Sequence, residues 1–280
     1  MRIALCNEVI APMSFPAQCV YAAKLGYDGL EIAPYTLSDE PHLLGAAQIA
    51  AARSAAQDAG IAITGLHWLL LKPAGLSIST RDDAVRRRTL DVMFALIDQC
   101  AELGGRYLVH GSPHQRRVDP GETRVAALAR AQESFAAVAG RAERAGVLYC
   151  IEALSAEQTP LINTLQEAAR MVAAIGSPAV RSMLDCSAAA RSESETPAAL
   201  VERWLPQGVI AHVQLNDRNR QGPGQGQQRF APLFAALKKH RYGGDMAVEP
   251  FDYVPDGPGA AARAIGYVRG VLEALDNPIS

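Results

Sequence analysis

The sequence has no uninterrupted apolar stretch long enough to cross a bilayer, and it has no marked excess of charge of one sign, its formal net charge being −2. The balanced charge removes the electrostatic reason to expect nucleic acid or an anionic membrane as a partner. The chain reaches Glu8 after only a few apolar residues, which argues against a secretory signal peptide. We therefore expect a cytoplasmic protein that acts on small molecules.

The sequence also lacks the cysteine pairing of a disulfide framework. Its five cysteines are odd in number and widely spaced, which is typical of reduced, cytosolic proteins. Hydrophobic residues make up 49% of the 280 residues and charged residues 20%, so the composition indicates neither disorder nor a fibrous class. The length is close to the ~250 residues of one barrel domain. We predict a single domain over residues 1–280.

One pattern recurs along the chain: an alanine-rich amphipathic helix ends in glycine, and a short β-rich run begins a few residues later. The glycines are Gly26, Gly60, Gly104 and Gly146. A glycine just past a helix end takes the left-handed turn that reverses the chain. The predicted strands are Arg2–Asn7, Asp28–Ile32, Ile61–Leu66, Arg106–His110, Val147–Glu152, Val180–Asp185, Ile210–Leu215 and Asp245–Glu249. Each is followed by a helical segment, which predicts an α/β fold, a single (β/α)8 TIM barrel.

The competing fold is an open, doubly wound sheet. Such a sheet usually carries a glycine-rich dinucleotide fingerprint after its first strand, and here that segment, from Cys6 to Pro12, contains no glycine. The strand-to-helix connections are long: Trp68–Asp82, Gly111–Gly121, Ala153–Pro160 and Asn216–Arg229. Long loops gathered at one end of a compact domain are commonly binding loops, so we expect a site at that end of the barrel.

Four of the predicted strands end in a polar side chain that could bind a metal: Glu152, Asp185, Gln214 and Glu249. They are separated by 33, 29 and 35 positions, about one strand-plus-helix unit each. The C-terminal ends of barrel strands meet at one mouth, so these side chains should converge. A single acid at a strand end often only solvates the mouth, but three on neighbouring strands favour a site. Oxygen donors suit Mn²⁺ or Mg²⁺ best, with Co²⁺ and Zn²⁺ as alternatives.

Such a site predicts proton transfer next to a carbonyl. A divalent ion polarises a carbonyl and an adjacent hydroxyl, which lowers the cost of removing a proton from the carbon between them. Glu152 and Glu249 would flank the substrate from different sides and could act as general base and acid. The expected intermediate is an enediolate.

Several strings carry a resemblance to a known family: His212-Val-Gln-Leu-Asn-Asp-Arg-Asn-Arg-Gln-Gly-Pro-Gly-Gln-Gly226, Leu-Asp185, Cys-Ile-Glu152-Ala, Val-Glu249-Pro-Phe and Gly29-Leu-Glu31-Ile. Over essentially its whole length, the chain resembles the sugar phosphate isomerase/epimerase family of xylose isomerase-like TIM barrels. The resemblance implies an isomerase or epimerase of carbohydrate metabolism that acts on a sugar or sugar phosphate and forms homo-oligomers. It also implies that Glu152, Asp185, Gln214 and Glu249 bind a divalent metal, and that the two glutamates exchange protons with opposite faces of the sugar.

The chain departs from the family pattern at two positions. Gln214 stands where the family usually has the metal-binding histidine of a His-x-His strand, so only His212 of that pair remains. Residues two apart share a strand face, which would place His212 deeper in the barrel. Ala188 stands where many relatives carry a substrate-contacting histidine. These departures bear on metal affinity and on substrate preference.

The resemblance further implies substrate contacts from residues near the strand ends and in the loops. The candidates are His67, Trp68, His110, Glu157, His212 and Arg220. A lone histidine or tryptophan is equally often a structural residue, Gln158 could take the place of Glu157, and Arg220 could be a solvated loop cation.

Two other functions remain open. The same enediolate can expel a β-hydroxyl group, which would make the protein a dehydratase or lyase. A barrel that has lost firm metal binding through Gln214 could instead bind a sugar without turning it over. Related DNA-repair endonucleases need many histidine ligands, and the six scattered histidines with no basic groove argue against that activity.

Overall fold

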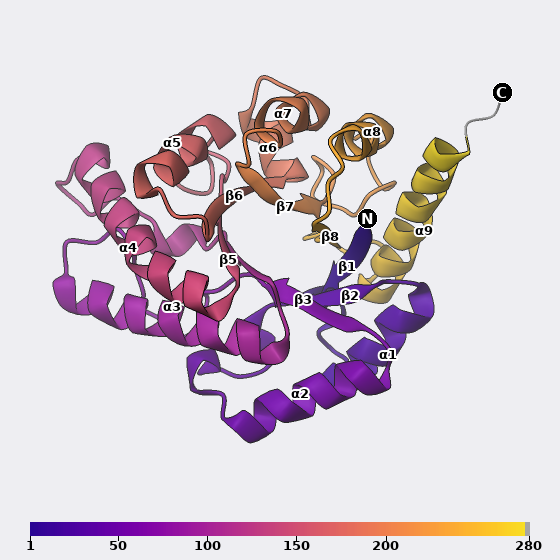
Figure 1. Ribbon diagram of the computed structural model, residues 1–280, viewed down its shortest axis with the longest axis horizontal. Coiled ribbons are helices and arrows are strands. Elements are labelled where there is room, and N and C mark those ends of the chain that lie inside the picture. Colours follow the sequence, from indigo (N-terminus) through magenta and orange to yellow (C-terminus); the bar gives the residue numbers. More distant parts are fainter. Residues whose placement is uncertain (278–280) are drawn as a thin grey trace.

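The computed structural model describes residues 1–277, which form a closed barrel of eight parallel strands surrounded by helices (Figure 1). The strands are β1 Arg2–Cys6, β2 Gly29–Ile32, β3 Ala62–Leu66, β4 Tyr107–His110, β5 Leu148–Glu152, β6 Val180–Asp185, β7 Ile210–Leu215 and β8 Asp245–Val248. Parallel pairing of β1 with both β2 and β8 closes the barrel. The TIM-barrel prediction is confirmed, and no strand end lies more than one residue from its predicted position.

The helices form a ring around the strands (Figure 1). They are α1 Phe15–Leu25, α2 Ala46–Asp58, α3 Asp83–Leu103, α4 Arg124–Ala145, α5 Leu165–Ile175, α6 Cys186–Ser192, α7 Pro197–Trp204, α8 Ala231–Lys239 and α9 Gly257–Asp276. Four short 3-10 helices are η1 Asn7–Ile10, η2 Pro34–Thr36, η3 Pro41–Leu43 and η4 Pro113–Gln115. Within residues 1–277, no helix combines the length and the apolar character that spanning a membrane requires.

Glycine reverses the chain between several helices and the strands that follow them. The four glycines predicted to do so, Gly26, Gly60, Gly104 and Gly146, have φ angles of 91°, 69°, 87° and 70°. These are left-handed values, which side chains disfavour. Two residues after Gly26, the Asp28 backbone N–H donates to the Ile3 carbonyl oxygen at 2.8 Å. The reversed chain therefore joins the barrel at once.

The barrel interior changes in character along its axis. At the N-terminal end, the buried Asp245 carboxylate pairs with Arg106 and accepts a hydrogen bond from Arg2 Nε at 2.9 Å. Further along, Tyr107, Val109, Cys150 and Met183 form an apolar cluster. Polar side chains follow at the C-terminal mouth, which is where the sequence places the candidate site.

Candidate active site

The four predicted metal ligands lie together at the C-terminal mouth of the barrel. Glu152 ends β5, Asp185 ends β6, Gln214 lies in β7 and Glu249 directly follows β8. Asp185 pairs with Gln214 across β6 and β7, so these two residues lie at the same level of the sheet. All four are buried, with exposed fractions between 1% and 6%. The fold thus brings the four strand ends around one small region.

Two adjoining cavities open at this mouth. The first is lined by His67, Trp68, Glu152, Gln214 and Glu249 among others, and we call it the acidic lobe. The second is lined by Asp185, Ser187, Ala188, Arg191 and Arg220 among others, and we call it the arginine lobe. Glu152, Leu154, Gln158 and Phe251 line both. The predicted ligands therefore face one divided cavity.

The carboxyl groups of the mouth lie in a poorly solvated environment. Burial raises the pKa of Glu152 well above its usual value, and the charges of Asp185 and Glu249 raise it further. Burial also raises the pKa values of Asp185 and Glu249, although hydrogen bonds from the Ala188 backbone and from His67 partly oppose this. Buried acids that raise one another's proton affinity are stabilised by a nearby cation. A divalent metal fits this requirement.

Gln214 presents an unused oxygen beside these acids. Its Nε2 donates to Glu31 Oε1 at 2.7 Å, whereas its Oε1 is buried and has no hydrogen-bond partner among residues 1–277. Leaving a buried carbonyl oxygen without a partner costs free energy. A hard cation would satisfy that oxygen. Three carboxylates and one amide oxygen make a donor set that fits Mn²⁺ or Mg²⁺.

Neighbouring donors hold Asp185 in one orientation. The Ala188 backbone N–H donates to Asp185 Oδ1 and Asn216 Nδ2 donates to Asp185 Oδ2, both at 2.6 Å. Asn216 Nδ2 also lies 3.2 Å from the carbonyl oxygen of Glu249, to which it donates. Asn216 therefore links the ends of three strands, and such outer partners commonly orient metal-binding carboxylates.

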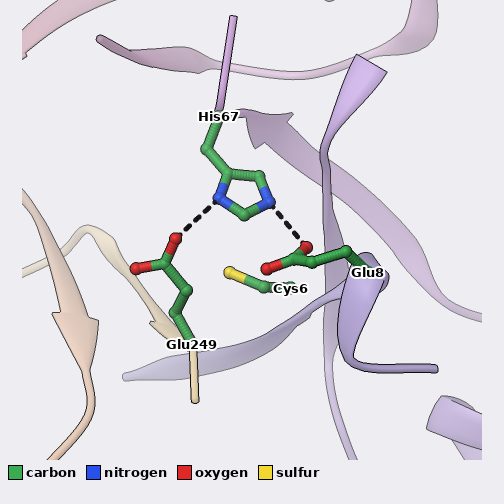
Figure 2. Close-up of side chains that lie close together, drawn as sticks. All are labelled: Cys6, Glu8, His67 and Glu249. Atoms are coloured by element: carbon green, nitrogen blue, oxygen red, sulfur yellow. Dashed lines mark hydrogen bonds and ion pairs between the residues drawn. The ribbon is translucent and has the colours of Figure 1, made fainter. Parts of the chain in front are cut away.

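His67 bridges two carboxylates across the mouth. Its Nδ1 lies 3.1 Å from Glu249 Oε1 and its Nε2 lies 2.9 Å from Glu8 Oε2 (Figure 2). Burial alone would lower the pKa of His67, but the charge of Glu8 and the hydrogen bonds to both glutamates outweigh burial and raise it well above its usual value. An imidazolium at this position balances part of the negative charge.

A second group of possible metal ligands surrounds His67. Ligand atoms of Cys6, Glu8, His67 and Glu249 all lie within 4.8 Å of one another (Figure 2). Burial raises the pKa of the Cys6 thiol well above its usual value, and the charge of Glu31 adds to this. This group, and not Glu152 with Asp185 and Glu249, is the one whose ligand atoms come that close together among residues 1–277. Sequence reasoning missed Cys6 and Glu8, although both lie at the C-terminal end of β1.

Glu31 lies below the mouth and connects several strands. Its Oε1 accepts the hydrogen bond from Gln214, while its Oε2 accepts one from Tyr107 Oη at 2.6 Å and lies 2.8 Å from His212 Nε2. Burial alone would raise the pKa of Glu31, but His212, His67 and Tyr107 lower it to about 2. Sequence reasoning assigned Glu31 no role. The available signal was a charged residue inside an otherwise apolar strand.

The structure corrects two predicted substrate contacts. His212 lies beneath Gln214, stacked on Tyr107 with ring centroids 4.0 Å apart, and lines neither lobe. His110 packs edge-on against Phe135 of α4 at 4.9 Å, outside the barrel. Strand alternation explains the position of His110: its neighbour Val109 faces the acidic lobe, so His110 faces the helices.

The remaining predicted contacts divide between the mouth and the surface. His67 and Trp68 line the acidic lobe, and Arg220 lines the arginine lobe. Trp68 and Arg220 have positive φ angles of 50° and 70°, a backbone strain found often at functional sites. Glu157 is exposed and pairs with Arg191, which corrects its prediction as a lining residue. Gln158, the alternative from the sequence, lines both lobes.

Comparisons with known proteins show the family and the fold of the chain. The chain is 26% identical to a D-psicose 3-epimerase of Agrobacterium fabrum over 236 residues, which cover 82% of this chain and 76% of the relative. It is 27% identical to that of Ruminiclostridium cellulolyticum over 235 residues, covering 82% and 75%. A crystal structure of D-psicose 3-epimerase in the presence of D-fructose has the same fold, with a TM-score of 0.83, 21% identity and coverage of 97% and 99%. Residues 19–271 match the xylose isomerase-like TIM barrel family, and the chain belongs to that family.

Proposed function

We propose that the protein is a divalent-metal-dependent ketose 3-epimerase in which Glu152 and Glu249 form the acid–base pair. The observation that carries the proposal is that Glu152, at the end of β5, and Glu249, directly after β8, are both buried and line one cavity at the barrel mouth. The D-psicose 3-epimerases among its relatives support the choice of a ketose.

Glu152, Asp185, Gln214 and Glu249 would hold the metal. Mn²⁺ and Mg²⁺ suit the oxygen donors, and the unpartnered Gln214 Oε1 supports an oxygen ligand from β7. When bound, a divalent ion polarises the substrate carbonyl and lowers the cost of ionising the neighbouring carbon.

The two glutamates would exchange protons with opposite faces of the sugar. One carboxylate takes the proton from carbon 3, which leaves an enediolate. The other, in its acid form, donates a proton to the opposite face of the same carbon. Burial of the mouth limits the access of water to the intermediate.

Replacing either glutamate should abolish proton transfer. We expect Glu152→Gln and Glu249→Gln each to lower the rate of D-fructose epimerisation by about 10²–10⁴-fold, because an amide cannot exchange the proton. The measurement is product NMR in D₂O, in which the parent should incorporate deuterium at carbon 3. Glu133→Gln, on the exposed side of α4, is the control. Parent-like rates in both variants, or a deoxy-keto product from the parent, would contradict the proposal.

The identity of the ligand from β7 can be tested by restoring a histidine. Gln214→His should tighten binding of Zn²⁺ and Co²⁺ more than that of Mn²⁺, because imidazole suits the former ions better than an amide oxygen does. Isothermal titration calorimetry on protein stripped with a chelator gives the affinities. Unchanged affinities for all three ions would show that Gln214 is not a ligand.

Glu31 should strengthen metal binding because it orients the Gln214 side chain through a hydrogen bond. A carboxylate only accepts hydrogen bonds, so it turns the Gln214 amide nitrogen towards itself and the oxygen away. Glu31→Gln removes that selection, and we expect about tenfold weaker Mn²⁺ binding. The thermal midpoint of the metal-free variant reports separately on folding. A variant that keeps the parent's affinity would refute this orienting role.

Gly111 gives Glu152 the space it occupies. A methyl group at position 111 would overlap Glu152 Oε2, so Gly111→Ala must displace the carboxylate. We expect about a 10²-fold loss of activity, since small misplacements of reacting groups have effects of this size. Gly243→Ala is the matched control, because a methyl group there meets no atom within 4 Å. If both variants were equally active, Glu152 would not need its present position.

A further inference from the structure

The two lobes of the mouth differ in charge. Among the residues that line the acidic lobe there is no arginine or lysine. The arginine lobe is lined by Arg191 of α6 and by Arg220 of the loop after β7. The acids in its wall, Glu152 and Asp185, are the ones proposed to hold the metal. If a metal binds those two acids, Arg191 and Arg220 are the charged residues that remain in the lining of this lobe.

The present partners of these arginines lie at the solvent-exposed rim. Arg191 pairs with Glu157, whose side chain is 70% exposed. Arg220 Nε lies 3.6 Å from Asp252 Oδ2, whose side chain is 54% exposed, and its guanidinium stacks on the Phe251 ring at 4.8 Å. Exposed ion pairs are weak because water screens them. A ligand could therefore take their place at little cost.

The lobe also adjoins the proposed reaction centre. Ala188 contributes only a methyl group to the wall between Asp185 and Arg191. Ser187 and Gln158 add polar side chains to the lining. A ketose bound in the acidic lobe could extend a substituent past Glu152 into this space.

We propose that the arginine lobe binds an anionic group of the substrate, so that the preferred substrate is a ketose bearing a phosphate ester or a carboxylate. The planar guanidinium group pairs with both anions through two parallel hydrogen bonds. This inference rests on the proposed function, because it assigns the sugar ring to the acidic lobe.

The test compares neutral and anionic ketoses on the Mn²⁺-loaded protein. The probes are D-fructose, its 1-phosphate, its 6-phosphate and D-fructuronate, titrated calorimetrically. We expect at least one anionic ketose to bind about tenfold more tightly than D-fructose, as hydrogen bonds to charged groups have effects of this size. The phosphate and fructuronate arms identify which anion the lobe prefers.

Two variants should shift this preference in opposite directions. Arg191→Gln should remove it, whereas Glu157→Gln should strengthen it, because a competing carboxylate is lost. Arg203→Gln is the control, since Arg203 is half-exposed, pairs with the exposed Glu195 and lines neither lobe. Equal affinity for neutral and anionic ketoses in the parent, or an unchanged preference in Arg191→Gln, would overturn the inference.

Inorganic phosphate separates this inference from the proposed function. If no ketose is turned over but phosphate binds the parent and not Arg191→Gln, the anion site stands and the epimerase proposal fails. If D-fructose is epimerised but phosphate binds the parent and Arg191→Gln equally, the epimerase proposal stands and the anion site fails.

Discussion

The polar interior of the barrel depends on one buried carboxylate, Glu31. A buried charge is tolerated only when hydrogen bonds and opposite charges surround it. Glu31 meets this condition with Gln214 and Tyr107 as donors and with His212 beside it, so residues of β4 and β7 are fixed relative to β2. Because Glu31 accepts the hydrogen bond from Gln214 Nε2, the other end of that amide, Oε1, is left without a hydrogen-bond partner among residues 1–277.

The balance of charge at the mouth follows from that arrangement. Glu152, Asp185 and Glu249 are buried acids with raised pKa values, and His67, which lies between Glu8 and Glu249, also has a raised pKa. A divalent cation would stabilise the ionised form of the three acids. Gln214 stands where the family resemblance implies a histidine, and its unpartnered amide oxygen is compatible with a hard metal.

The division of the mouth into two lobes separates chemistry from recognition. The acids that can move a proton line one lobe, and the arginines that can hold an anion line the other. Glu152 lies in the wall between them, within reach of both. In the proposed function, the proton transfer would take place at the acidic lobe, and the short helix α6, which carries Ala188 and Arg191, would set which substituent the substrate can bear.

The sequence by itself determined the barrel and the convergence of Glu152, Asp185, Gln214 and Glu249, because glycine-terminated helices, apolar strands and unit spacing are local signals. Only the tertiary structure decided which side chains at the strand ends face the cavity. It turned His110 outwards and brought Cys6 and Glu8 to His67. The physical reason is that the inward face of a strand depends on how the closed barrel tilts and staggers its neighbours, which no single segment encodes.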